Sequence, residues 1–107
     1  LPQSDNNYLI IAKHSGQCLD VKGGSTENGA NIQQFPCNGK SNQLFSFIPK
    51  QDGYFKIKAL HSGHYLDVKG AKGEPGANVQ QSTYSGGGNQ LWQLVETDQT
   101  KTDQEKE

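Results

Sequence analysis

The chain repeats itself at a spacing of 47 residues, and this duplication constrains its fold more than any other feature. The segment HSGQCLDVKG at 14–23 returns as HSGHYLDVKG at 61–70, and GANIQQ at 29–34 returns as GANVQQ at 76–81. Between Ile10 and Phe45, 20 of the 36 residues are identical to the residue 47 positions later, without a gap. Since 107 residues suffice for one small domain, we expect that domain to contain two copies of one supersecondary unit.

Each copy, called a lobe below, predicts four short strands rich in β-branched and aromatic residues and separated by turn residues. The expected strands are 8–14, 17–22, 30–35 and 43–48 in the first lobe, and 54–61, 64–69, 77–82 and 90–95 in the second. Gly16 and Gly63 are expected at the positive-φ position of tight hairpins. No helical periodicity of useful length is present, so the fold class is all-β.

The same pattern divides the chain into four segments. Residues 1–7 are expected to be an N-terminal linker, 8–53 the first lobe, 54–96 the second lobe, and 97–107 a disordered polar tail without apolar residues.

Composition excludes several classes of partner. The net charge is −1, so no basic surface is expected to bind nucleic acid. Apolar residues make up 31% of the chain, and no apolar run approaches the roughly 20 residues of a membrane span. No charged segment followed by an apolar one opens the chain, so we expect any signal peptide to have been removed.

The repeated residues resemble the ricin-B-type (R-type) lectin repeat. Each lobe carries Leu-Asp-Val on its second strand, Gln-Gln on its third, and a Q-x-[WF] element on its last, namely Gln43-Leu44-Phe45 and Gln90-Leu91-Trp92. The resemblance covers residues 8 to about 96. It implies a β-trefoil, in which three four-stranded lobes surround a pseudo-threefold axis. Because only two lobes are present, we expect an incomplete trefoil with Phe45 and Trp92 in its core.

This resemblance also implies a sugar pocket in the first lobe. Its residues would be Asp20, Gln33, Phe35, Asn42 and Gln43. An ionised Asp20 can accept hydrogen bonds from sugar hydroxyls, Phe35 offers a flat apolar platform, and Asn42 can bind a hydroxyl. Gln33 and Gln43 are expected to orient the other two polar groups. The alternative is that Asp20 ties a turn through backbone N–H groups and Phe35 is a satellite of the core.

The second lobe is expected to bind more weakly. It retains the polar residues Asp67, Gln80, Asn89 and Gln90, but Ser82 stands where the first lobe has Phe35. Losing the platform costs about 1–2 kcal/mol of apolar burial. Tyr84 lies two residues further on and could serve as a substitute platform.

The resemblance implies a disulfide between Cys18 and Cys37, because ricin-B-type lobes often carry one at this spacing. Their counterparts in the second lobe are Tyr65 and Tyr84, so both cysteines are replaced together. A disulfide indicates an oxidising compartment and a secreted, extracellular protein. The alternative is a pair of reduced, buried thiols in a cytosolic lectin.

Other chemistry finds little support in the sequence. His61 and His64 have no further ligand at metal-binding spacing, and no nucleophile–base set stands out. Gly39-Lys40-Ser41 lacks the earlier glycine of a phosphate-binding loop. We therefore expect no metal, no cofactor and no enzymatic activity.

The predicted function is a carbohydrate-binding (lectin) module that recognises glycans and glycoconjugates, with galactose or N-acetylgalactosamine as the first hypothesis. The alternative is a trefoil scaffold for protein interaction or inhibition that binds no sugar. Two lobes would leave one side of a trefoil core open and expose Phe45 and Trp92 to water. We therefore expect either a homo-oligomer or a place in a larger chain.

Overall fold

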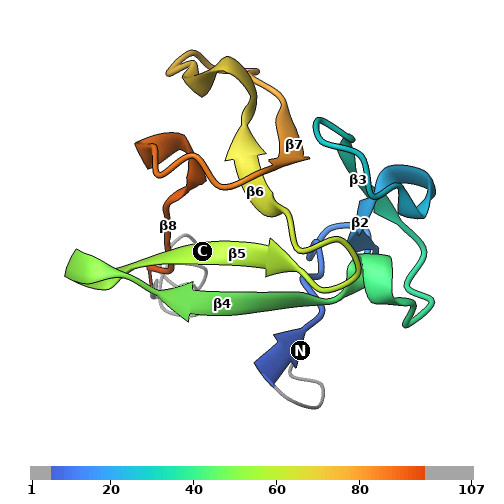
Figure 1. Cartoon of the computed structure of the whole chain (residues 1–107). Helices are drawn as coiled ribbons and strands as arrows, with labels where there is room; N and C mark the ends of the chain where they lie inside the picture. Colours follow the sequence, from blue (N-terminus) through green and yellow to red (C-terminus); the bar gives the residue numbers. More distant parts are fainter. Residues whose placement is uncertain (1–5, 96–107) are drawn as a thin grey trace, which may run out of the picture.

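The structure, a computed structural model, describes residues 6–95, in which eight short strands and no α-helix are found (Figure 1). The all-β prediction is confirmed. Most of the expected linker and the whole expected polar tail lie outside the described residues. The strands are β1 (Asn7–Tyr8), β2 (Cys18–Val21), β3 (Ile32–Phe35), β4 (Phe45–Pro49), β5 (Tyr54–Ala59), β6 (Tyr65–Val68), β7 (Val79–Ser82) and β8 (Trp92–Gln93).

Single 3-10 turns link several of these strands. They are η2 (Lys22–Gly24), η3 (Ser41–Gln43), η4 (Gln51–Gly53), η5 (Lys69–Ala71) and η6 (Gly88–Gln90). The turns η2 and η5, and likewise η3 and η6, occupy equivalent positions in the two lobes, as the sequence duplication requires.

The second and third strands of each lobe form an antiparallel hairpin. Asp20 lies opposite Gln33 in the β2–β3 pair, and Asp67 lies opposite Gln80 in the β6–β7 pair. The same residues therefore face each other in both lobes. Gly16 ahead of β2 has a φ of 70°, and its counterpart ahead of β6 has a φ of 75°, as predicted for these turns. Both hairpins lie to one side of the long β4–β5 pair (Figure 1).

The first and last strands of the lobes form an antiparallel ribbon in the order β1–β4–β5–β8. It belongs to a six-stranded sheet, because β5 also pairs with β6 at Lys58 and Tyr65. Phe45 of β4 is the register partner of Tyr8 on one side and of Ala59 on the other. Phe55 of β5 is paired with Trp92 of β8. The β4–β5 pairing joins the two lobes through backbone hydrogen bonds.

The two outer strands of this ribbon are much shorter than expected. β1 has two residues, of which only Tyr8 falls in the expected range 8–14, and β8 has two of the expected 90–95. By contrast, β4 has five residues and β5 has six. Within residues 6–95, β4 and β5 have neighbours on both edges in this ribbon, but β1 and β8 have one each. A strand extends only as far as a partner satisfies its backbone groups. Among residues 6–95, nothing pairs with the outer edges of β1 and β8, and we call these edges open.

The core lies between the ribbon and the hairpins. Its central cluster of buried apolar residues is Val21, Phe45, Ile57, Ala59 and Leu66, and Trp92 packs against them while partly exposed. The expectation that Phe45 would face water is wrong, because β1 and β5 flank its strand and leave the side chain 0% exposed. The apolar surface that stays open includes a hollow lined by Ile10, Leu19, Phe47, Trp92 and Leu94 among others, and Leu94 is 62% exposed.

A polar clamp fixes the first lobe against the second. His61 Nε2 donates to the Ser25 carbonyl at 2.7 Å, and His64 Nε2 donates to the Thr26 carbonyl at 3.0 Å. Gln81 Nε2 donates to the carbonyls of Ser25 and Glu27 at 3.1 and 2.7 Å. The loop after β2 is thus held by the hairpin turn and third strand of the other lobe.

Candidate functional site

Asp20 is the centre of a hydrogen-bonded group in the first lobe. Its side chain, only 3% exposed, accepts from Gln33 Nε2 at Oδ1 (3.1 Å), and from Asn42 Nδ2 (3.3 Å) and Gln43 Nε2 (2.9 Å) at Oδ2. A carboxylate has about four acceptor positions, so these three donors leave about one for another partner. The hydrogen bonds that the structure gives Asp20 come from side-chain amides of β3 and η3, and not from a backbone turn.

Gln43 braces this group from its buried side. Its side chain is completely buried, and Nε2 also donates to the Pro36 carbonyl at 3.1 Å. Its Oε1 accepts from the Asn38 amide at 2.9 Å. Gln43 therefore fixes both the Asp20 carboxylate and the turn after β3, and it lies too deep to touch a ligand.

Asn42 faces the carboxylate with its amide nitrogen, and its oxygen accepts none of these hydrogen bonds. Both of its N–H groups are used, one toward Asp20 and one toward the Val21 carbonyl at 3.0 Å. This geometry leaves Asn42 Oδ1 as an acceptor beside Asp20. Gln33 likewise uses Nε2 for Asp20, which orients its amide across the β2–β3 hairpin.

A surface pocket opens over this group. Its walls are formed by Asp20, Lys22, Gly23, Gly24, Gln33, Phe35, Asn38, Lys40 and Asn42. Four of the five predicted residues of this lobe thus line one pocket, and the fifth, Gln43, braces them. Phe35 stands at the pocket wall with 45% of its surface exposed, which makes its ring available to a ligand.

Sequence reasoning missed five residues of this pocket. They are Lys22, Gly23, Gly24, Asn38 and Lys40. The first two directly follow the Leu-Asp-Val motif and recur in the second lobe, a signal that could have found them. Asn38 and Lys40 have no identical counterpart, so the repeat gave no indication of them.

The second lobe repeats the polar group closely. Asp67 accepts from Gln80 Nε2 at 3.1 Å, from Asn89 Nδ2 at 3.2 Å and from Gln90 Nε2 at 2.9 Å. Each distance agrees with its first-lobe counterpart to within 0.1 Å. The two lobes therefore differ in the surrounding wall and not in the central carboxylate.

Tyr84, the candidate platform of the second lobe, contacts Tyr65. Their ring centroids are 5.6 Å apart, and Lys56 Nζ lies 4.4 Å from the Tyr84 centroid and 5.0 Å from that of Tyr65. The two tyrosines occupy the positions of the two cysteines in the first lobe. An aromatic pair capped by a cation thus stands in place of the cross-link. Whether Tyr84 also serves as a platform stays a prediction.

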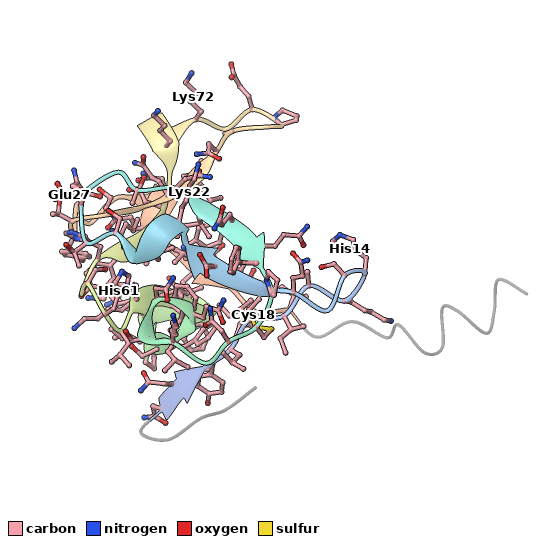
Figure 2. The ribbon with its side chains drawn as sticks, turned by 90° about the vertical axis from the view of Figure 1, so that its right-hand side faces the viewer. His14, Cys18, Lys22, Glu27, His61 and Lys72 are labelled. Atoms are coloured by element: carbon pink, nitrogen blue, oxygen red, sulfur yellow. A yellow bond between two sulfur atoms is a disulfide. The ribbon has the colours of Figure 1, made fainter. Side chains whose placement is uncertain are left out.

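The predicted disulfide is confirmed. Cys18 and Cys37 are joined with an S–S distance of 2.06 Å and a Cα–Cα distance of 5.1 Å (Figure 2). The alternative of two reduced thiols does not hold for this structure. The bond ties the start of β2 to the segment that follows Phe35, beside the pocket. Closing a loop of 19 residues stabilises the fold by about 3 kcal/mol.

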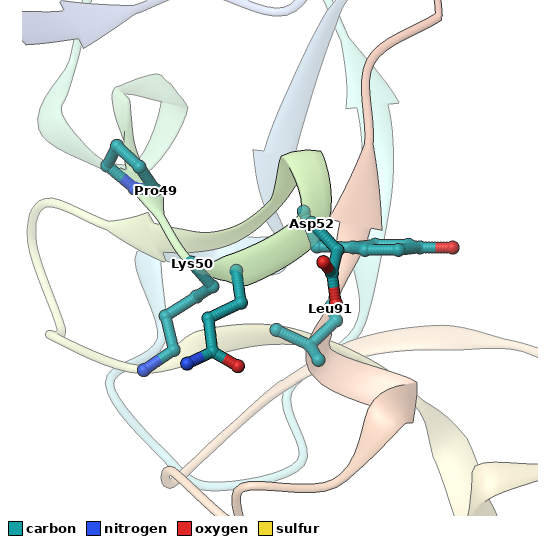
Figure 3. Close-up of a pocket in the computed structure, with 6 residues that line it drawn as sticks. Pro49, Lys50, Asp52 and Leu91 are labelled. Carbon is teal, nitrogen blue, oxygen red and sulfur yellow. The ribbon is translucent and has the colours of Figure 1, made fainter.

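A different pocket lies at the β4–β5 turn, where Pro49, Lys50, Asp52 and Leu91 contribute to its lining (Figure 3). It contains none of the predicted site residues. Over the described residues, no group of three or more His, Cys, Asp and Glu side chains could hold a metal ion, and no helix is long and apolar enough to cross a membrane.

Comparison with known proteins places these observations in a family. The model of the "ricin-type beta-trefoil lectin domain-like" family matches residues 1–81 and, in a second register, 41–104. Among solved structures, the designed threefold symmetric protein ThreeFoil is similar with a TM-score of 0.89 and 45% identity over 91% of this chain and 69% of its own.

Two natural enzymes contain similar segments. The exo-β-1,3-galactanase 1,3Gal43A from Clostridium thermocellum has a TM-score of 0.88 and 37% identity over 91% of this chain and 21% of its own. The β-agarase AgaB34 of Agarivorans albus is 45% identical over 47 residues, which are 43% of this chain and 10% of the agarase. The chain therefore spans about a fifth of the galactanase and matches about a tenth of the agarase.

Proposed function

The chain belongs to the ricin-type beta-trefoil lectin domain-like family, and on that premise we propose that it is a carbohydrate-binding module whose main site is the Asp20 pocket. Membership in this family supports carbohydrate binding in general. The observation that carries the proposal for this site is the arrangement of one buried, oriented carboxylate beside the exposed ring of Phe35.

The chemistry of the pocket suits a sugar. A hydroxyl can donate to the remaining acceptor position of Asp20 and a second one to Asn42 Oδ1, because both oxygens are held in place by bonds within the protein. The apolar C–H face of a pyranose can stack on Phe35. Prior ordering of these groups lowers the entropic cost of binding.

The pocket favours binding over cleavage. Glycoside hydrolysis usually requires two carboxyl groups placed on either side of the scissile bond. Asp20 is the one acidic residue among those that line this pocket, and its carboxylate is engaged by three amide donors. The module would direct an attached enzyme or toxin to a glycan, or act as a lectin by itself.

Galactose or N-acetylgalactosamine is our first choice of ligand. The similarity to part of an exo-β-1,3-galactanase supports a galactose-containing polymer. The second lobe has the same central carboxylate without an aromatic residue at Ser82, so we propose that it binds more weakly.

The open edges of β1 and β8 raise the question of what completes the fold of the module. We propose that a further lobe covers them, supplied either by a homo-oligomer or by the rest of a longer chain. Similarity to two thirds of a threefold symmetric protein supports this. The disulfide supports a secreted protein, because such bonds persist in oxidising compartments.

One observation favours the alternative of a scaffold that binds no sugar. Three of about four acceptor positions of Asp20 are already filled inside the protein, as expected for a purely structural carboxylate. The experiment that separates the two functions is a glycan array probed with the wild type and with Phe35→Ala.

The control for this array is Tyr54→Ala, which removes another exposed aromatic ring that does not line the Asp20 pocket. We expect Phe35→Ala to abolish most of the signal and Tyr54→Ala to leave it unchanged, with free galactose competing. Binding that no free sugar competes for would favour the scaffold. Equal binding by Phe35→Ala and wild type would place the site elsewhere.

A further inference from the structure

The pocket of the first lobe carries two cationic side chains and one acid. Lys22 and Lys40 line it together with Asp20. The carboxylate is 3% exposed and receives three hydrogen bonds from neutral amides, which stabilise its single negative charge without cancelling it. For the two ammonium groups, the structure gives no ion pair within residues 6–95. The two lysines therefore outnumber the single carboxylate, and the pocket lining carries a net positive charge.

The backbone of both lysines is held at two points. The Lys22 amide donates to Asn31 and its carbonyl accepts from Ser25, at 2.9 and 3.3 Å. The Lys40 amide donates to Asn38 Oδ1 at 2.9 Å, and its carbonyl accepts from the Gln43 amide at 2.9 Å. These anchors fix where each side chain starts, and both residues line the same pocket.

This positive charge is local. The whole chain has a net charge of −1, so a general attraction of the protein for anions is not expected. A ligand that gains from Lys22 and Lys40 must place its negative charge in the pocket itself.

The second lobe lacks one of the two cations. Lys22 recurs as Lys69, but Gly87 stands where the first lobe has Lys40. The pair of lysines is therefore a property of the first lobe.

We propose that the first lobe selects an acidic sugar, one that bears a carboxylate or a sulfate ester, and that Lys40 is the residue that sets this preference. The inference rests on the proposed carbohydrate binding and narrows its ligand class. The sugar ring would occupy the Phe35 and Asn42 side of the pocket while its anionic group meets the lysines.

The test is an NMR titration of the full chain labelled with ¹⁵N. The probes are methyl galactoside and methyl glucoside, the matching galacturonide and glucuronide, and galactose 6-sulfate. Amide signals of Gly23, Gly24 and Asn42 report on the first lobe, since these residues line its pocket. We expect at least one anionic probe to bind about threefold to tenfold more tightly than its neutral partner at low salt, and this advantage to shrink at high salt.

Two variants with the same change of net charge separate the pocket from the rest of the protein. Lys40→Gln removes the charge at the pocket wall, and Lys13→Gln removes one from an exposed residue that does not line the pocket. We expect Lys40→Gln to lose the anionic preference, so that the anionic probe and its neutral partner bind this variant within about twofold of each other. Lys13→Gln should behave as wild type.

The outcomes distinguish the two proposals. If the neutral sugars bind at these signals as tightly as the anionic ones, the acidic-sugar inference is overturned and the proposed function stands. An anionic preference that survives Lys40→Gln, or that Lys13→Gln removes equally, overturns it as well. If no probe shifts any of the three signals, both the inference and the proposed site fail.

Discussion

Replacing Asp20 by Asn tests whether the buried carboxylate is as important for folding as its contacts indicate. The substitution keeps the size of the side chain but removes its charge and turns one oxygen into an N–H donor. All three groups that face Asp20 are themselves donors, from Gln33, Asn42 and Gln43. At least one of them would then meet another donor.

The cost follows from the three hydrogen bonds. A bond to a charged group contributes about 1.5–3 kcal/mol and a neutral one about 0.5–1.5 kcal/mol, so each bond loses about 1 kcal/mol with the charge. The total is about 3 kcal/mol, from a domain whose free energy of unfolding is of order 5–10 kcal/mol. With a slope of about 1–2 kcal/mol per molar urea, the midpoint should fall by about 1.5–3 M.

Urea unfolding followed by tryptophan fluorescence measures this change. Asp67→Asn provides an internal replicate, because its three bonds have nearly the same lengths, and it should cost the same within about 1 kcal/mol. Asp52→Asn is the charge-matched control, an exposed residue whose φ of 61° suits Asn as well as Asp. If Asp20→Asn unfolds within 1 kcal/mol of wild type, as Asp52→Asn should, the argument from the three bonds is refuted.

Three further predictions concern the platform, the disulfide and the open edge. Ser82→Phe should strengthen binding at the second lobe by about fivefold or more, since it adds about 1 kcal/mol of apolar contact; an unchanged glycan titration would show that the platform is not what this lobe lacks. The double variant Cys18→Ala with Cys37→Ala should lower the free energy of unfolding by about 3 kcal/mol, measured in urea, and a loss below 1 kcal/mol would show that the cross-link adds little. Leu94→Lys should reduce the mass seen by light scattering to that of one chain if copies associate through the open side; a wild type already monomeric at micromolar concentration would contradict self-association.

The sequence by itself determined the repeating framework. A gapless duplication placed the same turn glycines and the same expected strands in each copy, so the equivalence of Asp20 and Asp67 followed directly. Local backbone preferences and side-chain alternation decide such features, and they act over a few residues. The cysteine pair could likewise be inferred from its joint replacement by two tyrosines together with the family resemblance.

Tertiary structure alone decided which apolar residues of the ribbon are buried and which residues form the wall of the Asp20 pocket. Phe45 is buried and Leu94 is exposed although both lie on or beside the last strand of a lobe, because β4 has two neighbours in the ribbon and β8 has one within the described residues. Lys40 became part of the pocket because the turn held by Gln43 brings it beside Asp20, 20 residues earlier in the chain. Both outcomes depend on which distant segments meet, and a pattern of nearby residues does not specify that.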